Sequence, residues 1–256
     1  MARILAIANQ KGGVGKTTTS VNLAAALALA QRKVLLVDLD PQGNATMGSG
    51  IDKRALARTV YHVLLGLGDM AQIRVRSEIG GFDLVPANRE LAGAEVELVE
   101  LPNRESRLRT ALAPLAPQYG YVLIDCPPSL SLLTINGLVA AQAVLIPMQC
   151  EYYALEGLSD LVGTIKRVRS LLNPALEIAG LLRTMYDPRN TLSQQVSQQL
   201  ETHFGAKVFS TLVPRNVRLA EAPSYGAPAV VWDRAAKGAQ AYLALAAEII
   251  AQEAST

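Results

Sequence analysis

The sequence predicts an α/β protein with a doubly wound, mainly parallel sheet that is flanked by helices. Continuous aliphatic runs such as residues 34–37 (VLLV) are typical of strands that are buried on both faces of a sheet. These runs alternate with segments of ten or more residues that have a helical pattern, which indicates crossovers between parallel strands. Half of the 256 residues are apolar, enough for a large core, and we expect residues 1–256 to form a single domain.

The expected elements alternate along the whole chain. Strands are expected where short, mostly aliphatic runs occur, at Arg3–Ala8, Lys33–Asp38, Phe82–Pro86, Tyr121–Asp125, Ala143–Pro147, Leu176–Thr184 and Val208–Val213. Helices are expected over the longer segments between them, at Thr17–Ala30, Asn88–Leu101, Ser106–Leu115, Leu132–Ala141, Leu155–Leu172, Leu192–Phe204 and Lys237–Gln252. Ligands of such sheets bind at the carboxyl ends of the strands, so functional side chains are expected there.

A glycine-rich segment directly after the first strand predicts a phosphate-binding loop. Its glycines let successive backbone N–H groups point at anionic oxygens, and the helix that follows adds its unpaired N–H groups. In such a loop Lys16 binds the β- and γ-phosphates and the Thr17 hydroxyl binds Mg²⁺. We therefore expect nucleotide contacts from Lys11, Gly12, Gly13, Val14, Gly15, Lys16, Thr17 and Thr18. The alternative is a glycine turn capped by a lysine, which the strand–loop–helix context disfavours.

One part of this loop departs from the common pattern. Gln10 stands where the usual spacing has a glycine, and Lys11 precedes the glycines. The segment KGGVGKTT resembles the deviant phosphate loop, KGGxGK[ST], of the ParA, MinD and nitrogenase iron protein group of P-loop NTPases. In that group the extra lysine reaches across a dimer interface to the nucleotide of the partner. The resemblance therefore implies an ATP-sandwich homodimer in which Lys11 and Lys16 act in catalysis; otherwise Lys11 is a solvated lysine on a loop.

Aspartates follow two of the aliphatic strands. Asp38 and Asp40 end the second expected strand, and Asp125 ends another. Mg²⁺ and its waters require negative charge facing the phosphate loop, so these carboxylates are candidates for the metal site. The resemblance implies that Asp125 is the Walker B aspartate, that Asp40 orients or activates the attacking water, and that Asp38 supports the metal and phosphate region. Alternatively, Asp38 and Asp40 cap strand ends or start turns.

Residues 213–226 (VPRNVRLAEAPSYG) closely resemble the segment of partition ATPases that packs on the adenine base. The resemblance implies that Pro214 and Asn216 contact adenine, through an apolar face and through an amide that can read a purine edge. Without the resemblance, the alternative interpretation of this segment is a polar strand-to-helix turn. Nearly the whole chain resembles this family, most closely its small chromosomal ParA (Soj-like) proteins. That implies an ATPase with slow intrinsic turnover and with ATP and Mg²⁺ as cofactors.

Three features separate the branches of this family. The cysteines Cys126 and Cys150 are not placed to bridge an iron–sulfur cluster, and residues 241–253 are acidic and Ala-rich rather than a basic membrane-binding helix. The chain starts directly at the first strand, so the operator binding of larger ParA proteins is not expected. We expect instead that the ATP-bound dimer binds double-stranded DNA non-specifically, through its phosphates.

Several basic residues are candidates for DNA contacts. They are Lys166, Arg167, Arg169, Arg183, Arg189, Arg215 and Arg218. Arg189 and Arg218 match DNA-binding positions of the Soj-like branch. The alternative is that each residue is a solvated surface charge or a local ion-pair partner.

Charge and hydropathy set wider limits. The formal net charge of +2 permits nucleic-acid binding without requiring it. No apolar run approaches the ~18 residues of a membrane span, and the two cysteines look like small buried hydrophobic residues in a reducing compartment. We therefore expect a cytoplasmic protein without membrane binding, and the resemblance implies that it is nucleoid-associated. The resemblance implies chromosome or plasmid partitioning, with a ParB-like partner that stimulates ATP hydrolysis; the alternative is a MinD/ParA-like ATPase that positions a protein cargo or regulates replication initiation.

Overall fold

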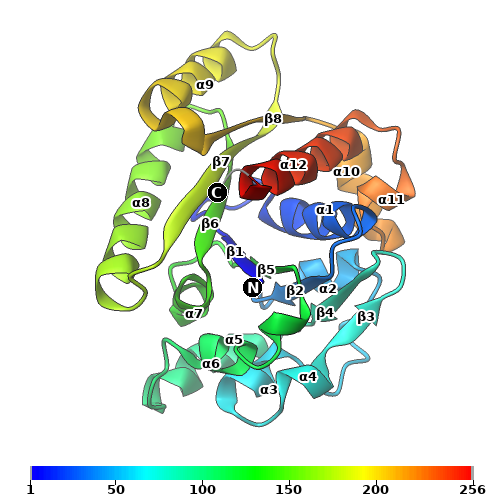
Figure 1. Cartoon of the computed structure of the whole chain (residues 1–256), viewed down its shortest axis with the longest axis vertical. Coiled ribbons are helices and arrows are strands. Elements are labelled where there is room, and N and C mark those ends of the chain that lie inside the picture. Colours follow the sequence, from blue (N-terminus) through cyan, green and yellow to red (C-terminus); the bar gives the residue numbers. More distant parts are fainter. Residues whose placement is uncertain (1, 255–256) are drawn as a thin grey trace.

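Residues 2–254, which the computed structural model describes, contain an eight-stranded sheet with helices on both faces (Figure 1). The strand order is β3-β4-β2-β5-β1-β6-β7-β8. The strands are β1 (Arg3–Ile7), β2 (Val34–Asp38), β3 (Val75–Ser77), β4 (Phe82–Val85), β5 (Tyr121–Asp125), β6 (Ala143–Gln149), β7 (Glu177–Tyr186) and β8 (Val208–Pro214). Neighbouring strands are parallel, apart from the antiparallel pair β3 and β4.

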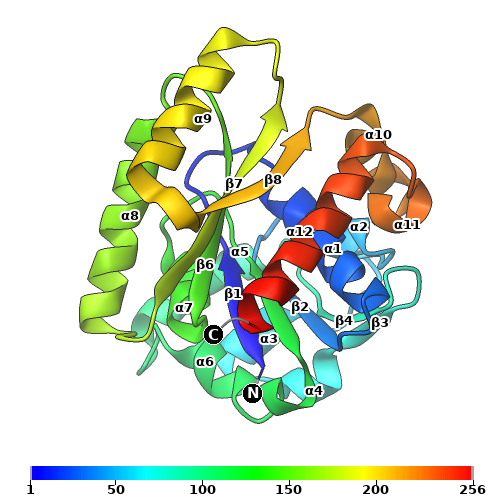
Figure 2. The ribbon, with the colours of Figure 1, turned by 45° about the horizontal axis from the view of Figure 1, so that its top comes forward.

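Helices follow most of the strands. The α-helices are α1 (Lys16–Leu29), α2 (Asn44–Gly48), α3 (Val60–Leu65), α4 (Met70–Ile73), α5 (Leu91–Glu97), α6 (Arg107–Leu112), α7 (Leu132–Ala140), α8 (Ala154–Leu171), α9 (Thr191–Phe204), α10 (Val217–Glu221), α11 (Ala229–Trp232) and α12 (Lys237–Ala254). Short 3₁₀ turns are η1 (Leu98–Glu100), η2 (Ala116–Gln118), η3 (Gly205–Lys207) and η4 (Ala222–Tyr225). Both views place α1 and α12 side by side on one face of the sheet and α7 and α8 on the other (Figure 1, Figure 2).

Alternate side chains of the central strands belong to two separate hydrophobic cores. Leu5 and Ile7 of β1 and Leu123 of β5 pack in the core that includes residues of α1 and α12. Ala6 and Val122, which alternate with them, pack in the core that includes residues of α7 and α8. Burial on both faces explains why the strands are continuous aliphatic runs.

The strand order places the predicted phosphate loop and carboxylates at one edge. β1 pairs with β5 on one side and β6 on the other, so the connection through α1 and the connection through α7 run in opposite directions from the sheet centre. Asp125 is the register partner of both Ile7 and Asp38. The carboxyl ends of β1, β2 and β5 therefore meet where the topology reverses, which is the usual ligand site of such sheets.

The predicted fold class is confirmed, and all seven predicted strands are present with small differences at their ends. The sequence does not predict β3, because three residues at the sheet edge carry no clear periodicity. It also does not predict α2, α3, α4, α10 and α11, which have four to six residues each. The helix expected at 88–101 begins only at Leu91 and passes into a 3₁₀ turn at Leu98. Within residues 2–254 no helix has both the length and the apolar character that crossing a membrane requires.

Gly180 provides a test of the packing between β7 and β8. A Cβ at this position would lie 2.6 Å from Cε2 and 2.8 Å from Cζ of the buried Phe209. Gly180→Ala should therefore lower the free energy of unfolding by about 1–3 kcal/mol, because the ring must move within a filled core. Urea unfolding measures the change.

The matched control is Gly163→Ala in α8, where an added Cβ would have no described atom within 4 Å. This control should leave stability unchanged or raise it by up to ~1 kcal/mol. Equal unfolding free energies for the two variants would contradict the proposed contact.

Candidate active site

The loop between β1 and α1 has the backbone of a phosphate cradle. Gly13 (φ 75°) and Gly15 (φ 85°) adopt left-handed conformations that favour glycine. α1 begins directly after Gly15, so the N–H groups of its first turn are directed out of the helix end. Val14 is buried, and its carbonyl accepts a hydrogen bond of 2.8 Å from Oγ1 of Thr184, at the end of β7. The predicted loop is therefore anchored to the sheet.

Lys16 is buried within this loop, with 7% of its surface exposed. Its Nζ donates a hydrogen bond of 3.0 Å to the backbone carbonyl of Lys11, so the side chain folds back over the loop. Burial lowers the pKa of Lys16, and the charges of Asp125 and Asp40 counteract that shift. An ammonium group has three donor hydrogens, so one backbone acceptor leaves two for phosphate oxygens.

Asp125 is fully buried at the end of β5. Ser20 of α1 donates a hydrogen bond of 2.7 Å to Oδ1, whereas Oδ2 has no partner among the described residues. Burial and then the charge of Asp38 raise the pKa of Asp125, while the hydrogen bond from Ser20 and the nearby Thr17 hydroxyl lower it. An unpaired carboxylate oxygen close to Thr17 fits Mg²⁺, which takes oxygen ligands. Residues 2–254 hold no cluster of three or more His, Cys, Asp or Glu side chains suited to a metal, and Mg²⁺ needs none because phosphates and waters complete its shell.

Asp38 anchors the segment that follows β2. Its Oδ2 accepts hydrogen bonds from the backbone N–H and the hydroxyl of Thr46, at 2.9 and 2.7 Å, and its Oδ1 accepts one from the N–H of Asp40 at 3.1 Å. Oγ1 of Thr46 in turn accepts a hydrogen bond from the N–H of Ala87, beyond β4. Burial raises the pKa of Asp38, and the bonds from Thr46 oppose that shift. Asp38 thus holds residues 38–50, the switch segment, and its support of a metal stays a prediction.

Asp40 lies closer to the surface of the same site. It is 9% exposed, and its Oδ1 accepts a hydrogen bond of 2.8 Å from the N–H of Gln42. Its N–H donates to Oδ1 of Asp38, the register partner of Asp125, and its charge raises the pKa of Lys16. The structure therefore brings Asp40, Asp125 and Lys16 together, as the sequence predicts.

A cavity of about 260 Å³ opens beside the phosphate loop. It is lined by Gly15 and Thr18 of the loop region and by Pro214 and Asn216, the two residues predicted to contact adenine. The amide oxygen of Asn216 is buried and has no hydrogen-bond partner within residues 2–254, so it is available to a donor such as an exocyclic amino group. Met185, which has a left-handed backbone (φ 49°), also lines the cavity and was missed by the sequence analysis, as was Thr184.

Lys11 points away from the loop that contains it. Its Nζ forms an ion pair with Glu151, just beyond β6, and 43% of the Lys11 side chain is exposed. Its backbone N–H donates a hydrogen bond of 3.0 Å to the side chain of Asn9. The side chain of Lys11 is therefore accessible at the surface, and its role across a dimer interface stays a prediction.

The two arginines predicted to bind DNA are exposed and locally paired. Nε and Nη2 of Arg189 donate to the carboxylate of Asp187, at 3.0 and 2.9 Å, and hydrogen bonds from Arg189 hold the pKa of Asp187 well below its ordinary value. Arg218 pairs with Glu221 and Asp233. The side chains of Arg189 and Arg218 are 89% and 52% exposed, so they remain accessible to an anion.

Arg183 is a correction to the list of DNA candidates. Its side chain is 5% exposed and pairs with Glu201, while Nη1 donates to Ser197 and Nη2 to the carbonyl of Phe209, both at 2.7 Å. The prediction was wrong because the side chain points from β7 under α9. In contrast, Lys166, Arg167 and Arg169 are exposed on α8.

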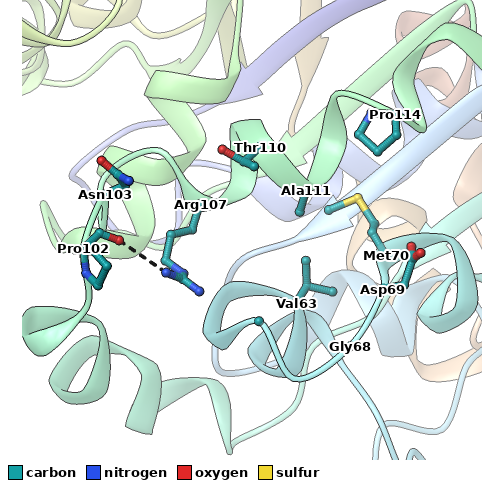
Figure 3. A pocket seen from close by; sticks show the side chains of 11 residues that line it. Val63, Gly68, Asp69, Met70, Pro102, Asn103, Arg107, Thr110, Ala111 and Pro114 are labelled. Atoms are coloured by element: carbon teal, nitrogen blue, oxygen red, sulfur yellow. Dashed lines mark hydrogen bonds between the residues drawn. The ribbon is translucent and has the colours of Figure 1, made fainter.

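A second cavity lies apart from this site, between α3, α4 and α6 (Figure 3). It has about 440 Å³, and none of the residues that line it belongs to the predicted site. Its charged side chains are already engaged: Arg107 donates to the carbonyls of Leu64 and Pro102, and Asp69 caps α4. The phosphate loop remains the candidate active site.

Comparisons with known proteins show which proteins this chain resembles. A family model described as an AAA domain matches residues 2–178. The chromosome partitioning protein ParA of Caulobacter vibrioides is 52% identical over 98% of this chain and 95% of that protein. The sporulation initiation inhibitor protein Soj of Bacillus subtilis is 52% identical over 98% of this chain and 99% of that protein. A solved Mycobacterium smegmatis structure, described as cobyrinic acid a,c-diamide synthase with a bound ATP analogue and magnesium, has a TM-score of 0.84 at 42% identity and covers 96% of this chain and 93% of that chain.

Asp125→Asn should make the stability of the nucleotide-free protein less dependent on pH. Because the pKa of Asp125 is raised in the folded protein, the unfolded chain loses this proton first above the ordinary carboxyl pKa of ~4, and stability falls as the pH rises from there. Asparagine carries no such proton. At pH 8 we expect the free energy of unfolding of the variant to be higher than that of the wild type by ~1 kcal/mol or more. This difference should become smaller as the pH is lowered towards 5.

Denaturant unfolding in a chelator, at several pH values, measures this difference. Ser20→Ala is the control, because it removes a hydrogen bond to Asp125 and keeps the carboxyl group. A difference between Asp125→Asn and wild type that is constant from pH 5 to pH 8 would contradict the raised pKa.

Proposed function

This chain belongs to the ParA/Soj family of chromosome-partitioning ATPases, and we propose that it is a single-domain, nucleotide-controlled switch whose ATP-bound homodimer binds double-stranded DNA non-specifically. Identity of 52% over nearly the full length of two such relatives supports this proposal. The observation that carries it is the juxtaposition of a two-lysine phosphate loop with Asp125, whose Oδ2 has no partner among residues 2–254.

ATP and Mg²⁺ are the cofactors that we propose for the site. The loop N–H groups and Lys16 bind the β- and γ-phosphates, while the Thr17 hydroxyl and Asp125, directly or through water, hold Mg²⁺. When bound, Mg²⁺ neutralises charge on the phosphates. Pro214 packs on adenine, and Oδ1 of Asn216 accepts a hydrogen bond from its amino group. The M. smegmatis structure with an ATP analogue and magnesium supports this assignment.

Asp40 is the residue that we propose for hydrolysis. It follows the strand that ends beside Asp125, and its charge acts on Lys16, so it can orient a water that attacks the γ-phosphate. It belongs to the switch segment, which Asp38 holds through Thr46. Loss of the γ-phosphate then releases the contacts of this segment with the nucleotide. A switch of this kind requires a long-lived ATP state, so we propose slow intrinsic turnover.

Lys11 connects the nucleotide to assembly. In a single subunit its ammonium group pairs with Glu151. We propose that in the dimer it leaves Glu151 for the phosphates bound to the partner subunit. Both side chains are about half exposed, and a surface ion pair of this kind contributes only ~0–1 kcal/mol. Breaking the pair between Lys11 and Glu151 therefore costs little free energy.

The dimer then places Arg189 and Arg218 of both subunits along one duplex. Their contacts go to phosphates, so binding has little base preference and falls with salt. Hydrolysis opens the dimer, and a ParB-like centromere-binding partner stimulates that step. This cycle is the one expected of a cytoplasmic, nucleoid-associated partitioning protein, in line with the names of the relatives.

DNA binding as a function of nucleotide tests the proposal. Fluorescence anisotropy with a random-sequence duplex should detect binding with ATP or a slowly hydrolysed analogue, and none with ADP or without nucleotide. Binding should weaken when the salt concentration is raised fourfold. Lys16→Ala, which lacks the phosphate-binding ammonium group, should bind neither ATP nor DNA.

ATP-dependent dimerisation without DNA binding in any state would overturn the DNA part of this function. It would favour a role in positioning a protein cargo or in regulating replication initiation, since those functions use the same ATP site.

Asp40→Ala should bind ATP and accumulate as a dimer while hydrolysing ATP at least ~100-fold more slowly, because the attacking water loses its partner. Phosphate release measures hydrolysis, and light scattering after gel filtration measures the dimer. Asp52→Ala is the control, since Asp52 is exposed beyond the switch segment and pairs with Arg54. Hydrolysis at the wild-type rate by Asp40→Ala would remove Asp40 from the mechanism.

A further inference from the structure

Arg218 lies between two carboxylates and an aromatic stack, a group that we call the Arg218 cage. Its Nη1 lies 3.0 Å from Oε2 of Glu221, and its Nε lies 3.2 Å from Oδ2 of Asp233. The guanidinium carbon is 5.5 Å from the centroid of the Trp232 ring. Tyr225 stacks on Trp232, with ring centroids 4.6 Å apart and planes inclined by 22°. The cage therefore joins α10, η4 and the end of α11.

The two carboxylates of the cage more than offset the positive charge of Arg218, but the side chain of Arg218 stays accessible. Two carboxylates face one guanidinium group, so an approaching phosphate meets a net negative cluster. The side chains of Arg218, Glu221 and Asp233 are 52%, 43% and 33% exposed. Ion pairs at such positions are weak, so a phosphate can replace the carboxylates, although it must compete with them.

Trp232 determines how Arg218 is presented. A guanidinium group over an indole ring keeps its N–H groups directed sideways, in its own plane, where they can form charged hydrogen bonds. In the single subunit Nη1 donates a hydrogen bond to Glu221, and Nε forms an ion pair with Asp233. A DNA phosphate has oxygens of the same kind and can take the same positions without moving the arginine from the ring.

We propose that Glu221 and Asp233 compete with DNA phosphate for Arg218, and that Trp232 is a positioning residue for this exchange. The proposal rests on the DNA-binding function proposed above and names how that function is regulated. Competition at each Arg218 weakens DNA binding by one subunit, whereas a dimer makes two such exchanges on the same duplex. The carboxylates therefore lower the DNA affinity of both forms, and one subunit, with a single exchange, is left with the weaker binding.

The double variant Glu221→Gln with Asp233→Asn tests the competition. In the presence of the ATP analogue, its affinity for random duplex, expressed per dimer, should rise at least ~threefold above that of a charge-matched control. The control is Glu100→Gln with Glu105→Gln, which removes two carboxylates near the opposite core of the sheet. An equal rise in the control would overturn the proposal, because general charge would then explain the effect.

A double-mutant cycle tests the positioning role. Trp232→Leu should lower DNA affinity at least ~threefold, and Trp232→Phe, which keeps an aromatic face, should restore most of it. Arg218→Gln should reduce the dependence of log K on log salt by about 1.8, for two phosphate contacts in a dimer. In the Arg218→Gln background, Trp232→Leu should have no further effect. A full additional loss there would overturn the positioning role.

A measurement without DNA separates this proposal from the function on which it rests. Trp232 is the single tryptophan of the sequence, so its emission reports on the cage. Iodide, an anionic quencher, should quench Trp232 more strongly in Glu221→Gln with Asp233→Asn than in the charge-matched control. Equal quenching in the double variant and in the control would overturn the proposed cage. It would leave unaffected any DNA binding that the wild type shows. Stronger quenching with no DNA binding by the wild type in any nucleotide state overturns the proposed function and, with it, DNA as the competing ligand.

Discussion

The burial of Asp125 is the constraint on which the rest of the site depends. A carboxylate at the end of a central strand, with an oxygen that no described residue satisfies, is unfavourable in the nucleotide-free protein. Its place is determined by the parallel register, which sets it beside Ile7 and Asp38, and by Ser20 of α1. The same register puts the loop after β1 directly above it. One edge of the sheet therefore supplies both the phosphate cradle and the negative charge that a metal between them would require.

The switch segment connects this edge to the Arg218 cage through direct contacts. Asp38 holds Thr46 by two hydrogen bonds, and the segment ends at Gly50. A Cβ at Gly50 would lie 2.9 Å from the carbonyl oxygen of Gly226, and one at Gly226 would lie 3.2 Å from the Cα of Gly50. Gly226 follows Tyr225, which stacks in the cage. Because the two backbones touch, the switch segment and the cage segment cannot both shift unless this contact moves with them or breaks.

Sequence reasoning located the parts of the site that are contiguous in the chain. The phosphate loop is one segment, and Asp125 follows an apolar strand, so both have local signals. Thr184 and Met185 have none: Thr184 reaches Val14 across 170 residues, and the left-handed backbone of Met185 leaves no mark in the sequence. The prediction that Arg183 contacts DNA was wrong for a related reason, because the sequence does not say which side of β7 faces α9. In the fold, long aliphatic runs were predictable, whereas β3 and the short helices form mainly through tertiary packing.

The distribution of ion pairs is consistent with the proposed assembly-dependent DNA binding of a chain whose net charge is only +2. Each cation proposed to act on another molecule is paired within its own subunit: Lys11 with Glu151, Arg189 with Asp187, and Arg218 with Glu221 and Asp233. In an isolated subunit these three cations are therefore already compensated. Surface pairs of this kind are weak, so a few simultaneous exchanges can replace them. In the proposed dimer the second set of exchanges is intramolecular, which is how that dimer would bind DNA where the monomer does not.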